Sequence, residues 1–438
     1  MIKRLTIIAI ITGIGHLTTL LSLKYISIYI DNNTIALIGE LDSLSLLIVS
    51  IVAFGLQLSA TREIAIADDW QKEYLITQSA RFTLSIGLFL LGFTGFYFSK
   101  NYLFFMAPII ALNADYALYG RGKPITGAFV ALIRILIPSI ALVIGSLFFK
   151  DYIVVIFSLS LILGYFLAGI IVSRSLAISY FVKPQIKSLY KYLESVNIGI
   201  ASFALFFIGI GIINIMSYFY NNETIAVIYI ALKLYMIFKG VRRIIVQSFF
   251  KELQDIQTTL KVDYFAIIAG TLFLFTIIFY PNVLIQLLVD EKFTYYFTTF
   301  LILGVAGFVS SFSTSSGTRL LLKKEDSKYS FNLICASLIS IVSGAVLWLF
   351  FGDYPYLIAV SVLFGEIAVS VLNIISLKES RYILNRLQIA YPVFIFILAM
   401  YPINYLIGQT IFSMIISLLI FGILTFIYTN KRFKINDL

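Results

Sequence analysis

This 438-residue sequence contains one cysteine, one histidine and few charged side chains. The lone Cys335 excludes a disulfide framework and any metal site built on cysteines. The lone His16 excludes histidine-rich metal chemistry and, because it lies within an apolar stretch, a Ser-His-Asp triad. The GxxxxGK[ST] phosphate loop is absent from the sequence. We therefore expect no cofactor, no bound metal and no ATP hydrolysis by this chain.

Long apolar runs take the place of charge. Hydrophobic residues make up 60% of the chain and charged residues only 12%. Runs of about 20 apolar residues recur along the whole length, and a helix needs that length to cross a hydrocarbon core. Membrane β-strands would be about half as long and would alternate in polarity. The sequence therefore predicts an all-α polytopic membrane protein. Its fourteen predicted spans are at 5–30, 34–59, 79–99, 102–119, 124–149, 152–172, 195–220, 224–249, 262–280, 294–322, 329–351, 354–377, 388–407 and 409–428.

One stretch of the sequence occurs twice. TIALI at 34–38 matches TIAVI at 224–228, and a Ser-x-x-basic-Glu-aliphatic pattern starting at Ser59 recurs at Ser248. The offset of about 190 residues is too long for a solenoid repeat and fits two halves of a transporter. We expect two parallel lobes of six helices, related by an axis along the membrane normal, with a cavity between them. The predicted parts are lobe 1–172, link 173–194, lobe 195–377 and two extra helices at 388–428.

Loop charge predicts the orientation. Most of the 32 lysines and arginines lie at the chain ends and in the loops after even-numbered spans. The opposite loops hold only Lys100, Lys150 and Lys292. By the positive-inside rule, both termini and the 173–194 link are expected to be cytoplasmic. The basic excess then needs no nucleic acid as a partner. The link carries tyrosines among its lysines, so we expect an interfacial amphipathic segment in preference to a loose linker.

Ionisable side chains inside spans are candidate functional residues because lipid makes them costly. Lys24 and Glu40 flank the first outer turn at equal separations, so each lies roughly 12 Å from the outer surface. They form either a structural ion pair or a charged pair that faces the cavity. Asp42 lies slightly deeper and is an alternative partner for Lys24, which would leave Glu40 free.

Four other ionisable residues lie deep in spans. Arg134, roughly 16 Å into its helix, either binds a multivalent anion or pairs with a carboxylate of its own half. Lys233 is mid-membrane and corresponds through the repeat to Ser43 on a polar face, which favours the cavity. Glu366 is either a proton-titrating carboxylate or a helix-packing partner. His16 is either a hydrogen-bonded packing residue or a proton carrier.

Two features lie near the cytoplasmic ends of spans. Asp115 is close to the end of its span, and we expect a surface acid that reaches the interface. The serine-rich run at 310–318 either allows close helix packing or lines a path for a polar headgroup.

Two segments resemble a known family. Val52–Ala65, which reads VAFGLQLSATREIA, is similar to the FGL…REIA segment of Wzx-type polysaccharide flippases, and Tyr119–Lys123 resembles their LGR-x-K link. These flippases belong to the multidrug/oligosaccharidyl-lipid/polysaccharide (MOP) exporter superfamily. The resemblance implies a bacterial inner-membrane flippase for undecaprenyl-pyrophosphate-linked oligosaccharide, such as an O-antigen repeat unit. It also implies alternating access coupled to H+ or Na+, with a glycan polymerase and a chain-length regulator as partners. The sequence departs from the family in having few arginines inside its spans.

The resemblance gives the intramembrane charges two sets of roles. The bases Lys24, Arg134 and Lys233 would hold the phosphates, and Glu40, Asp42, Glu366 and His16 would bind or titrate the coupling ion. A cation-coupled drug exporter and a lipid II flippase of the same superfamily are the alternatives. A membrane-embedded polymerase or acyltransferase is less favoured, because the exterior loops are short and poor in charge.

Overall fold

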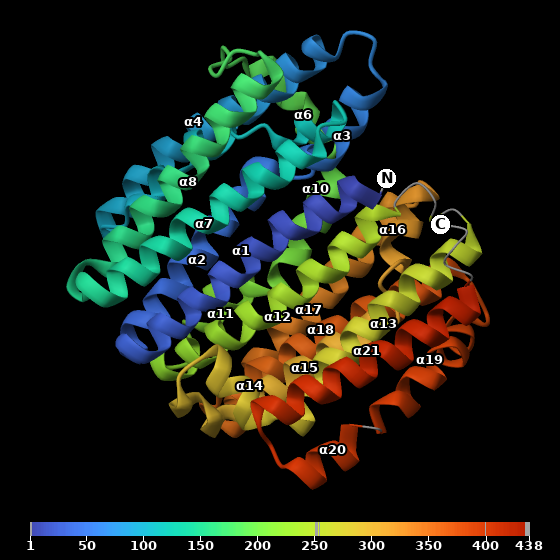
Figure 1. The fold of residues 1–438 in the computed structure, drawn as a ribbon. Coiled ribbons are helices and arrows are strands. Elements are labelled where there is room, and N and C mark those ends of the chain that lie inside the picture. Colours follow the sequence, from blue (N-terminus) through green and yellow to red (C-terminus); the bar gives the residue numbers. More distant parts are fainter. Residues whose placement is uncertain (1, 250–252, 254, 399, 434–438) are drawn as a thin grey trace. The chain divides into compact units, whose positions relative to one another are not determined.

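The structure is a computed structural model that describes residues 2–249, 253, 255–398 and 400–433. Within those residues the chain forms helices and no strands, which confirms the predicted all-α class (Figure 1). The chain divides into two compact units, unit 1 at residues 1–229 and unit 2 at residues 230–438. Each is described separately below. The predicted lobe boundaries at 172, 195 and 377 remain a prediction.

Unit 1 holds the first eleven α-helices and the start of the twelfth. The α-helices are α1 (Ile2–Tyr29), α2 (Asn32–Ala53), α3 (Leu56–Ile66), α4 (Trp70–Ser99), α5 (Ala107–Leu112), α6 (Asp115–Gly120), α7 (Pro124–Phe148), α8 (Ile153–Leu176), α9 (Tyr190–Glu194), α10 (Val196–Phe207), α11 (Ile213–Met216) and α12 (Asn222–Ser248). Short 3-10 turns join them: η1 (Tyr102–Phe105), η2 (Lys150–Tyr152), η3 (Ile186–Leu189) and η4 (Ile210–Ile212).

Unit 2 contains the rest of α12 and the helices that follow. They are α13 (Ile256–Phe279), α14 (Pro281–Leu288), η6 (Glu291–Tyr296), α15 (Phe297–Ser311), α16 (Ser316–Leu322), α17 (Asp326–Phe351), α18 (Pro355–Leu377), α19 (Tyr382–Leu398), α20 (Met400–Ile407) and α21 (Ile411–Phe433).

Local sequence fixes where several of these helices begin. Asp31, Asp69 and Asp255 are N-caps whose carboxylates accept hydrogen bonds from backbone amides three residues later, at the starts of α2, α4 and α13. Proline occupies the first turn of α7, α14 and α18, where its missing N–H costs nothing.

The described residues contain twelve segments long and apolar enough to cross a membrane, or thirteen if the bent pair α10–α11 is one span. The chain is a multi-pass membrane protein. The predicted count of fourteen is not confirmed, because the region 102–119 is divided into η1, α5 and α6. The predicted helix 34–59 is also interrupted, since α2 ends at Ala53 and Gly55 follows with a φ of 80°. A Cβ on Gly55 would lie 2.5 Å from the backbone nitrogen of Gly199 in α10. The backbone at the end of α2 can approach α10 this closely because Gly55 has no side chain.

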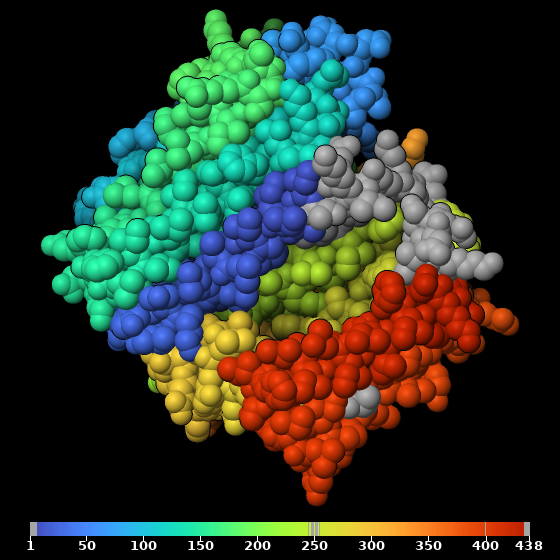
Figure 2. All heavy atoms as spheres, viewed as in Figure 1, coloured from blue at the N-terminus to red at the C-terminus, as the bar shows by residue number. Residues whose placement is uncertain are grey.

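The surface of α1, α7 and α8 shows how unit 1 meets its surroundings. These helices pack in sequence, α1 on α7 and α7 on α8, and lie side by side on the face seen in Figure 2. Large apolar side chains of all three are exposed, including Leu17, Ile140 and Leu159. Exposed aliphatic side chains on long apolar helices are expected where a helix faces lipid.

The packing order of unit 1 recurs in unit 2. In unit 1, α4 packs on α5, α5 on α8, and α7 on α8. In unit 2, α13 packs on α15, α15 on α18, and α17 on α18. This order supports the repeat inferred from the sequence, whereas the axis that would relate the two halves remains a prediction. Two residues of the repeat pattern, Lys251 and Glu252, lie outside the described residues.

Candidate functional site: buried polar clusters at two broken helices

Unit 1 contains a break between α5 and α6, at Asn113 and Ala114. Backbone carbonyls exposed by such a break must find donors, because lipid supplies none. Arg81 of α4 supplies them: its Nη1 donates to the Asn113 carbonyl at 3.0 Å and its Nη2 to the Ile110 carbonyl at 3.4 Å. Gln78, one turn earlier, donates to the Ala111 carbonyl. A buried cation therefore caps the carboxyl end of α5.

Asp115 stands on the other side of this break, in the first turn of α6. Its Oδ2 accepts a hydrogen bond from Nη2 of Arg134 on α7 at 2.9 Å, and Gln57 of α3 lies 3.4 Å from both carboxylate oxygens. Only 4% of Asp115 is exposed. The expectation of a surface acid was wrong, because the break directs this residue toward α7 and away from the interface. Arg134 has the carboxylate partner from its own half that was one of its two predicted outcomes.

Asp42 belongs to the same region of unit 1. It is buried on α2, close enough to Tyr165 of α8 and to Tyr229 for electrostatic interaction with both side chains. Tyr165 of α8 also lies under the Arg134 guanidinium, with its ring centroid 5.4 Å away. Asp42, Asp115, Arg81 and Arg134 thus form a charge-balanced cluster, here called the unit 1 cluster.

Glu40, Lys24 and His16 are the other predicted site residues of unit 1. Glu40 is half-buried and lines a cavity of about 300 Å³ together with Asn33, Thr34, Leu37 and Asn222. Lys24 and His16 are half-buried on α1. The predicted pairing of Lys24 with Glu40 or Asp42 remains a prediction.

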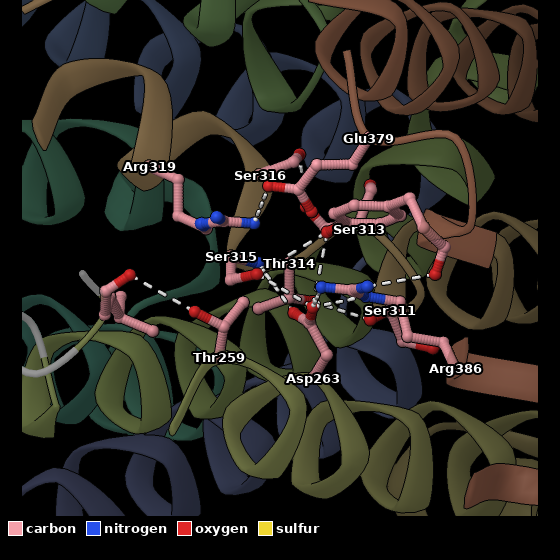
Figure 3. Close-up of polar contacts among 12 residues, drawn as sticks. Thr259, Asp263, Ser311, Ser313, Thr314, Ser315, Ser316, Arg319, Glu379 and Arg386 are labelled. Carbon is pink, nitrogen blue, oxygen red and sulfur yellow. Dashed lines mark hydrogen bonds and ion pairs between the residues drawn. The ribbon is translucent and has the colours of Figure 1, made fainter. Parts of the chain in front are cut away.

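Unit 2 contains a second break, between α15 and α16, and it falls in the serine-rich run. Asp263 of α13 accepts hydrogen bonds from the Ser315 backbone amide at 2.8 Å and from the Ser315 hydroxyl at 2.7 Å (Figure 3). The Tyr382 hydroxyl donates to the same carboxylate at 3.2 Å. Here a buried anion satisfies an amide at the break, the reverse of the arrangement in unit 1.

Arg386 of α19 neutralises Asp263. Its Nε donates to Asp263 Oδ2 at 2.6 Å, Nη2 is also 2.6 Å from that oxygen, and Nη1 donates to the Tyr382 carbonyl at 2.9 Å. The side chains of Asp263 and Arg386 are 0% and 2% exposed. We call Asp263, Ser315, Tyr382 and Arg386 the α13–α19 clasp. It joins the break to the helices that follow the twelfth predicted span.

The remaining residues of the serine-rich run take part in helix packing, and the alternative of a path for a polar headgroup remains a prediction. Ser313 donates to Ser370 of α18 at 2.7 Å. A Cβ on Gly270 would lie 2.8 Å from the Ser311 hydroxyl oxygen, so α13 and α15 approach closely there. The hydroxyl groups are used within the protein, and the small residues allow close packing.

Glu366 of α18 has a basic partner on another helix. Lys239 of α12 donates to Glu366 Oε1 at 2.6 Å, with the two side chains 17% and 6% exposed. Arg242, one turn further on, donates to the Ser310 hydroxyl. The buried Tyr235 ring lies beside Lys239, its centroid 5.4 Å from Nζ. This unit 2 basic cluster has two cations for one carboxylate. Lys233, six residues before Lys239, is half-buried on the same helix.

Sequence reasoning missed Arg81, Lys239, Asp263 and Arg386. Arg81, Asp263 and Arg386 lie within two residues of the edges of predicted spans, and Lys239 lies ten residues before the end of one. A signal was present for Lys239 and Arg242, because residues three apart share a face on a helix that was already predicted. No comparable signal marks Arg81 or Asp263, whose partners lie far away in sequence.

Comparisons with known proteins agree with this architecture. No family model and no curated protein matches the sequence. Among solved structures, a lipid II flippase MurJ in an inward closed conformation matches with a TM-score of 0.73 and 14% identity, covering 98% of both chains. An inward-facing multidrug resistance MATE transporter of the MOP superfamily matches with a TM-score of 0.62 and 13% identity, covering 88% of this chain and 98% of that one. A MOP superfamily transporter from Pyrococcus furiosus matches with a TM-score of 0.53 and 13% identity, covering 89% and 96%. These neighbours are transporters and flippases, and the chain shares their all-helical fold.

Proposed function

We propose that this protein is a flippase that carries an undecaprenyl-pyrophosphate-linked oligosaccharide, such as an O-antigen repeat unit, across the bacterial inner membrane. In this proposal the prenyl tail stays in lipid while pyrophosphate and sugars cross through a polar path. Both termini are cytoplasmic, and exchange between inward and outward states is coupled to H+ or Na+.

The observation that carries the proposal is the full-length likeness to a flippase of a lipid-linked substrate. That match covers 98% of this chain and so includes α19 to α21, whereas the multidrug transporter reported above leaves about a tenth of the chain unmatched. These last helices are integral to unit 2. Besides the α13–α19 clasp, Tyr264 of α13 hydrogen-bonds Thr429 at 3.0 Å, and Tyr280 hydrogen-bonds Ser417 at 2.6 Å.

Excess positive charge supports an anionic substrate. Among the described residues, the unit 2 basic cluster holds two cations, Lys239 and the half-buried Arg242, for one carboxylate, and such an excess of positive charge favours an anionic ligand. We assign phosphate binding to Lys24, Arg134 and Lys233. Because Asp115 already pairs with Arg134, a phosphate at Arg134 would share or displace that carboxylate.

The carboxylates are assigned to ion coupling. Glu40 lines a cavity, whereas Asp42 and Glu366 are buried beside Tyr229 and Lys239. Their protonation, or Na+ binding, would change the charge balance of each cluster. His16 is the fourth candidate. A cation-coupled drug exporter would use the same carboxylates. Only identification of the transported substrate therefore distinguishes the two functions.

Deletion of the gene in its source bacterium tests the proposal. We expect loss of the surface glycan and accumulation of its lipid-linked repeat unit on the cytoplasmic side of the inner membrane. Re-expression of the intact protein should restore the glycan. Normal surface glycan combined with new sensitivity to cationic drugs would reject the flippase and favour the drug exporter. Accumulation of single repeat units on the periplasmic side would instead indicate a polymerase.

A further inference from the structure

The link between α8 and α9 is an extended segment held against two long helices of unit 1. Residues 178–185 are not helical. The Ser79 hydroxyl of α4 donates to the Lys183 carbonyl at 2.9 Å, and the Gln185 amide donates to the Thr83 hydroxyl at 2.9 Å. On the other side, the Tyr180 hydroxyl donates to the Phe166 carbonyl of α8 at 3.3 Å. The link is therefore attached at a defined height on α4 and α8.

On α4, the attachment lies at the level expected for the membrane boundary. The α4 helix has 30 residues, whereas about 20 residues span the hydrocarbon core. Its last turns expose Leu90, Leu91 and Phe98, as expected in lipid. Twenty residues counted back from the end of α4 lead to the level of Ser79, where the link is attached. Loop charge predicts this side of the membrane to be cytoplasmic.

The outward face of the link combines apolar and cationic side chains. Phe181 is 66% exposed and Ile186 is 81% exposed. Lys183 and Lys187 lie beside them and are exposed. Within the described residues, neither ammonium group has a hydrogen bond or ion pair with the protein. Apolar side chains at the acyl boundary with lysines beside them form the pattern by which protein segments bind anionic membrane surfaces.

Lys191 provides a contrast within the same link. It is buried, with its Nζ 2.9 Å from Glu63 Oε2 and 3.2 Å from Glu73 Oε2. Burial lowers the pKa of Lys191, but the hydrogen bonds to Glu63 and Glu73 outweigh that effect and raise it above its ordinary value. The protein thus supplies counter-ions for Lys191 and leaves Lys183 and Lys187 to an external anion.

We propose that the face formed by Phe181, Lys183, Ile186 and Lys187 binds anionic phospholipids of the cytoplasmic leaflet. Phe181 and Ile186 enter the acyl boundary, and the two lysines bind headgroup phosphates. A lysine near an anionic surface contributes about five-fold to binding. The pair is therefore expected to enrich anionic lipid around the link by about ten-fold or more. The proposal does not depend on the transported substrate.

A quenching experiment on the full-length protein tests it. The single cysteine is replaced (Cys335→Ser), and a fluorophore is attached at Gln185→Cys, an exposed position of the link. The protein is placed in nanodiscs of phosphatidylcholine with 20% phosphatidylglycerol. In separate samples the bromine quencher is carried on the acyl chains of one lipid or the other. We expect the brominated phosphatidylglycerol to quench several-fold more per mole than the brominated phosphatidylcholine.

Variants distinguish lipid binding at Lys183 and Lys187 from a general electrostatic attraction of the protein to anionic lipid. Lys183→Gln with Lys187→Gln should make the two lipids quench equally per mole, and the corresponding double arginine variant should keep the preference. Lys72→Gln is the matched control, because Lys72 is an exposed lysine of α4 roughly 10 Å further from the boundary than Ser79. Equal quenching in the unmodified link, an unchanged preference in the double glutamine variant, or no quenching by either lipid would each overturn the proposal.

Discussion

Removal of one charge from the α13–α19 clasp should destabilise the protein far more than removal of both. Arg386→Met leaves the Asp263 carboxylate buried, with only the amide and hydroxyl of Ser315 and the hydroxyl of Tyr382 as donors. Breaking a buried ion pair by removing one partner costs about 3–5 kcal/mol. Three neutral donors remain, so we expect a loss of about 3 kcal/mol, near the lower end of that range. Methionine retains most of the apolar volume of the arginine stem, so the loss reports charge more than a cavity.

The double variant Asp263→Asn with Arg386→Met removes the charge imbalance. Replacing both members of a buried pair by neutral groups is often close to neutral, so we expect it to recover most of the lost stability. Arg381→Met is the control, because this arginine is exposed immediately before α19 and surface substitutions usually change stability by less than about 0.5 kcal/mol.

The single cysteine supplies the assay. Cys335 is half-buried on α17, and its labelling by a thiol-reactive dye should accelerate as unit 2 unfolds with rising temperature or denaturant. The unmodified protein should have the highest unfolding midpoint, followed by Arg381→Met and then the double variant. Arg386→Met should have by far the lowest. If Arg386→Met unfolds with the control, or if the double variant is as unstable as the single one, the assigned role of the pair is refuted.

Three other outcomes are expected. Asp115→Asn should cost up to about 3 kcal/mol by leaving Arg134, whose side chain is 20% exposed, without its counter-ion, and adding Arg134→Met should restore stability in the same thermal assay; additive losses would contradict this. Lys233→Ala should abolish surface glycan with normal protein abundance, and Lys233→Arg should retain part of it because charge persists while shape changes; normal glycan with alanine would reject the assignment. Partial burial raises the pKa of Asp31, but hydrogen bonds from the side chain and backbone of Thr34 outweigh it and lower the net pKa. Asp31→Ala should therefore cost about 1 kcal/mol at neutral pH, and denaturant titrations should show the difference fading as pH falls below about 4, where the carboxylate becomes protonated.

The helices could be predicted because one physical constraint dominates their sequence. Lipid requires about 20 apolar residues per span. Such runs can be recognised in the sequence without knowing which helices pack against each other. The breaks at Asn113 and Ser315 could not be predicted in the same way. Serine, asparagine and glycine also suit close helix packing in membranes, so their presence does not distinguish a packed helix from an interrupted one. What holds each break open is a charged residue on another helix.

The candidate site could be predicted only as a set of isolated charges. The sequence places Arg134 and Glu366 inside spans, and both lie in polar clusters, Glu366 buried and Arg134 with 20% of its side chain exposed. Their partners Asp115 and Lys239 lie 19 and 127 residues away, and both were attributed to the membrane boundary. Pairing depends on which faces of two helices meet, and helical periodicity alone does not specify that contact.

The two breaks are satisfied by side chains of opposite charge. Arg81 satisfies carbonyl groups at one break, and Asp263 satisfies an amide at the other. Exchanging these residues would place a cation against N–H groups and an anion against C=O groups, so neither half could adopt the other's solution by one substitution. Each break therefore depends on a different type of residue. These different requirements agree with a sequence likeness that is legible only around residues 27–65 and 217–254, although the packing of α4, α5, α7 and α8 in unit 1 resembles that of α13, α15, α17 and α18 in unit 2.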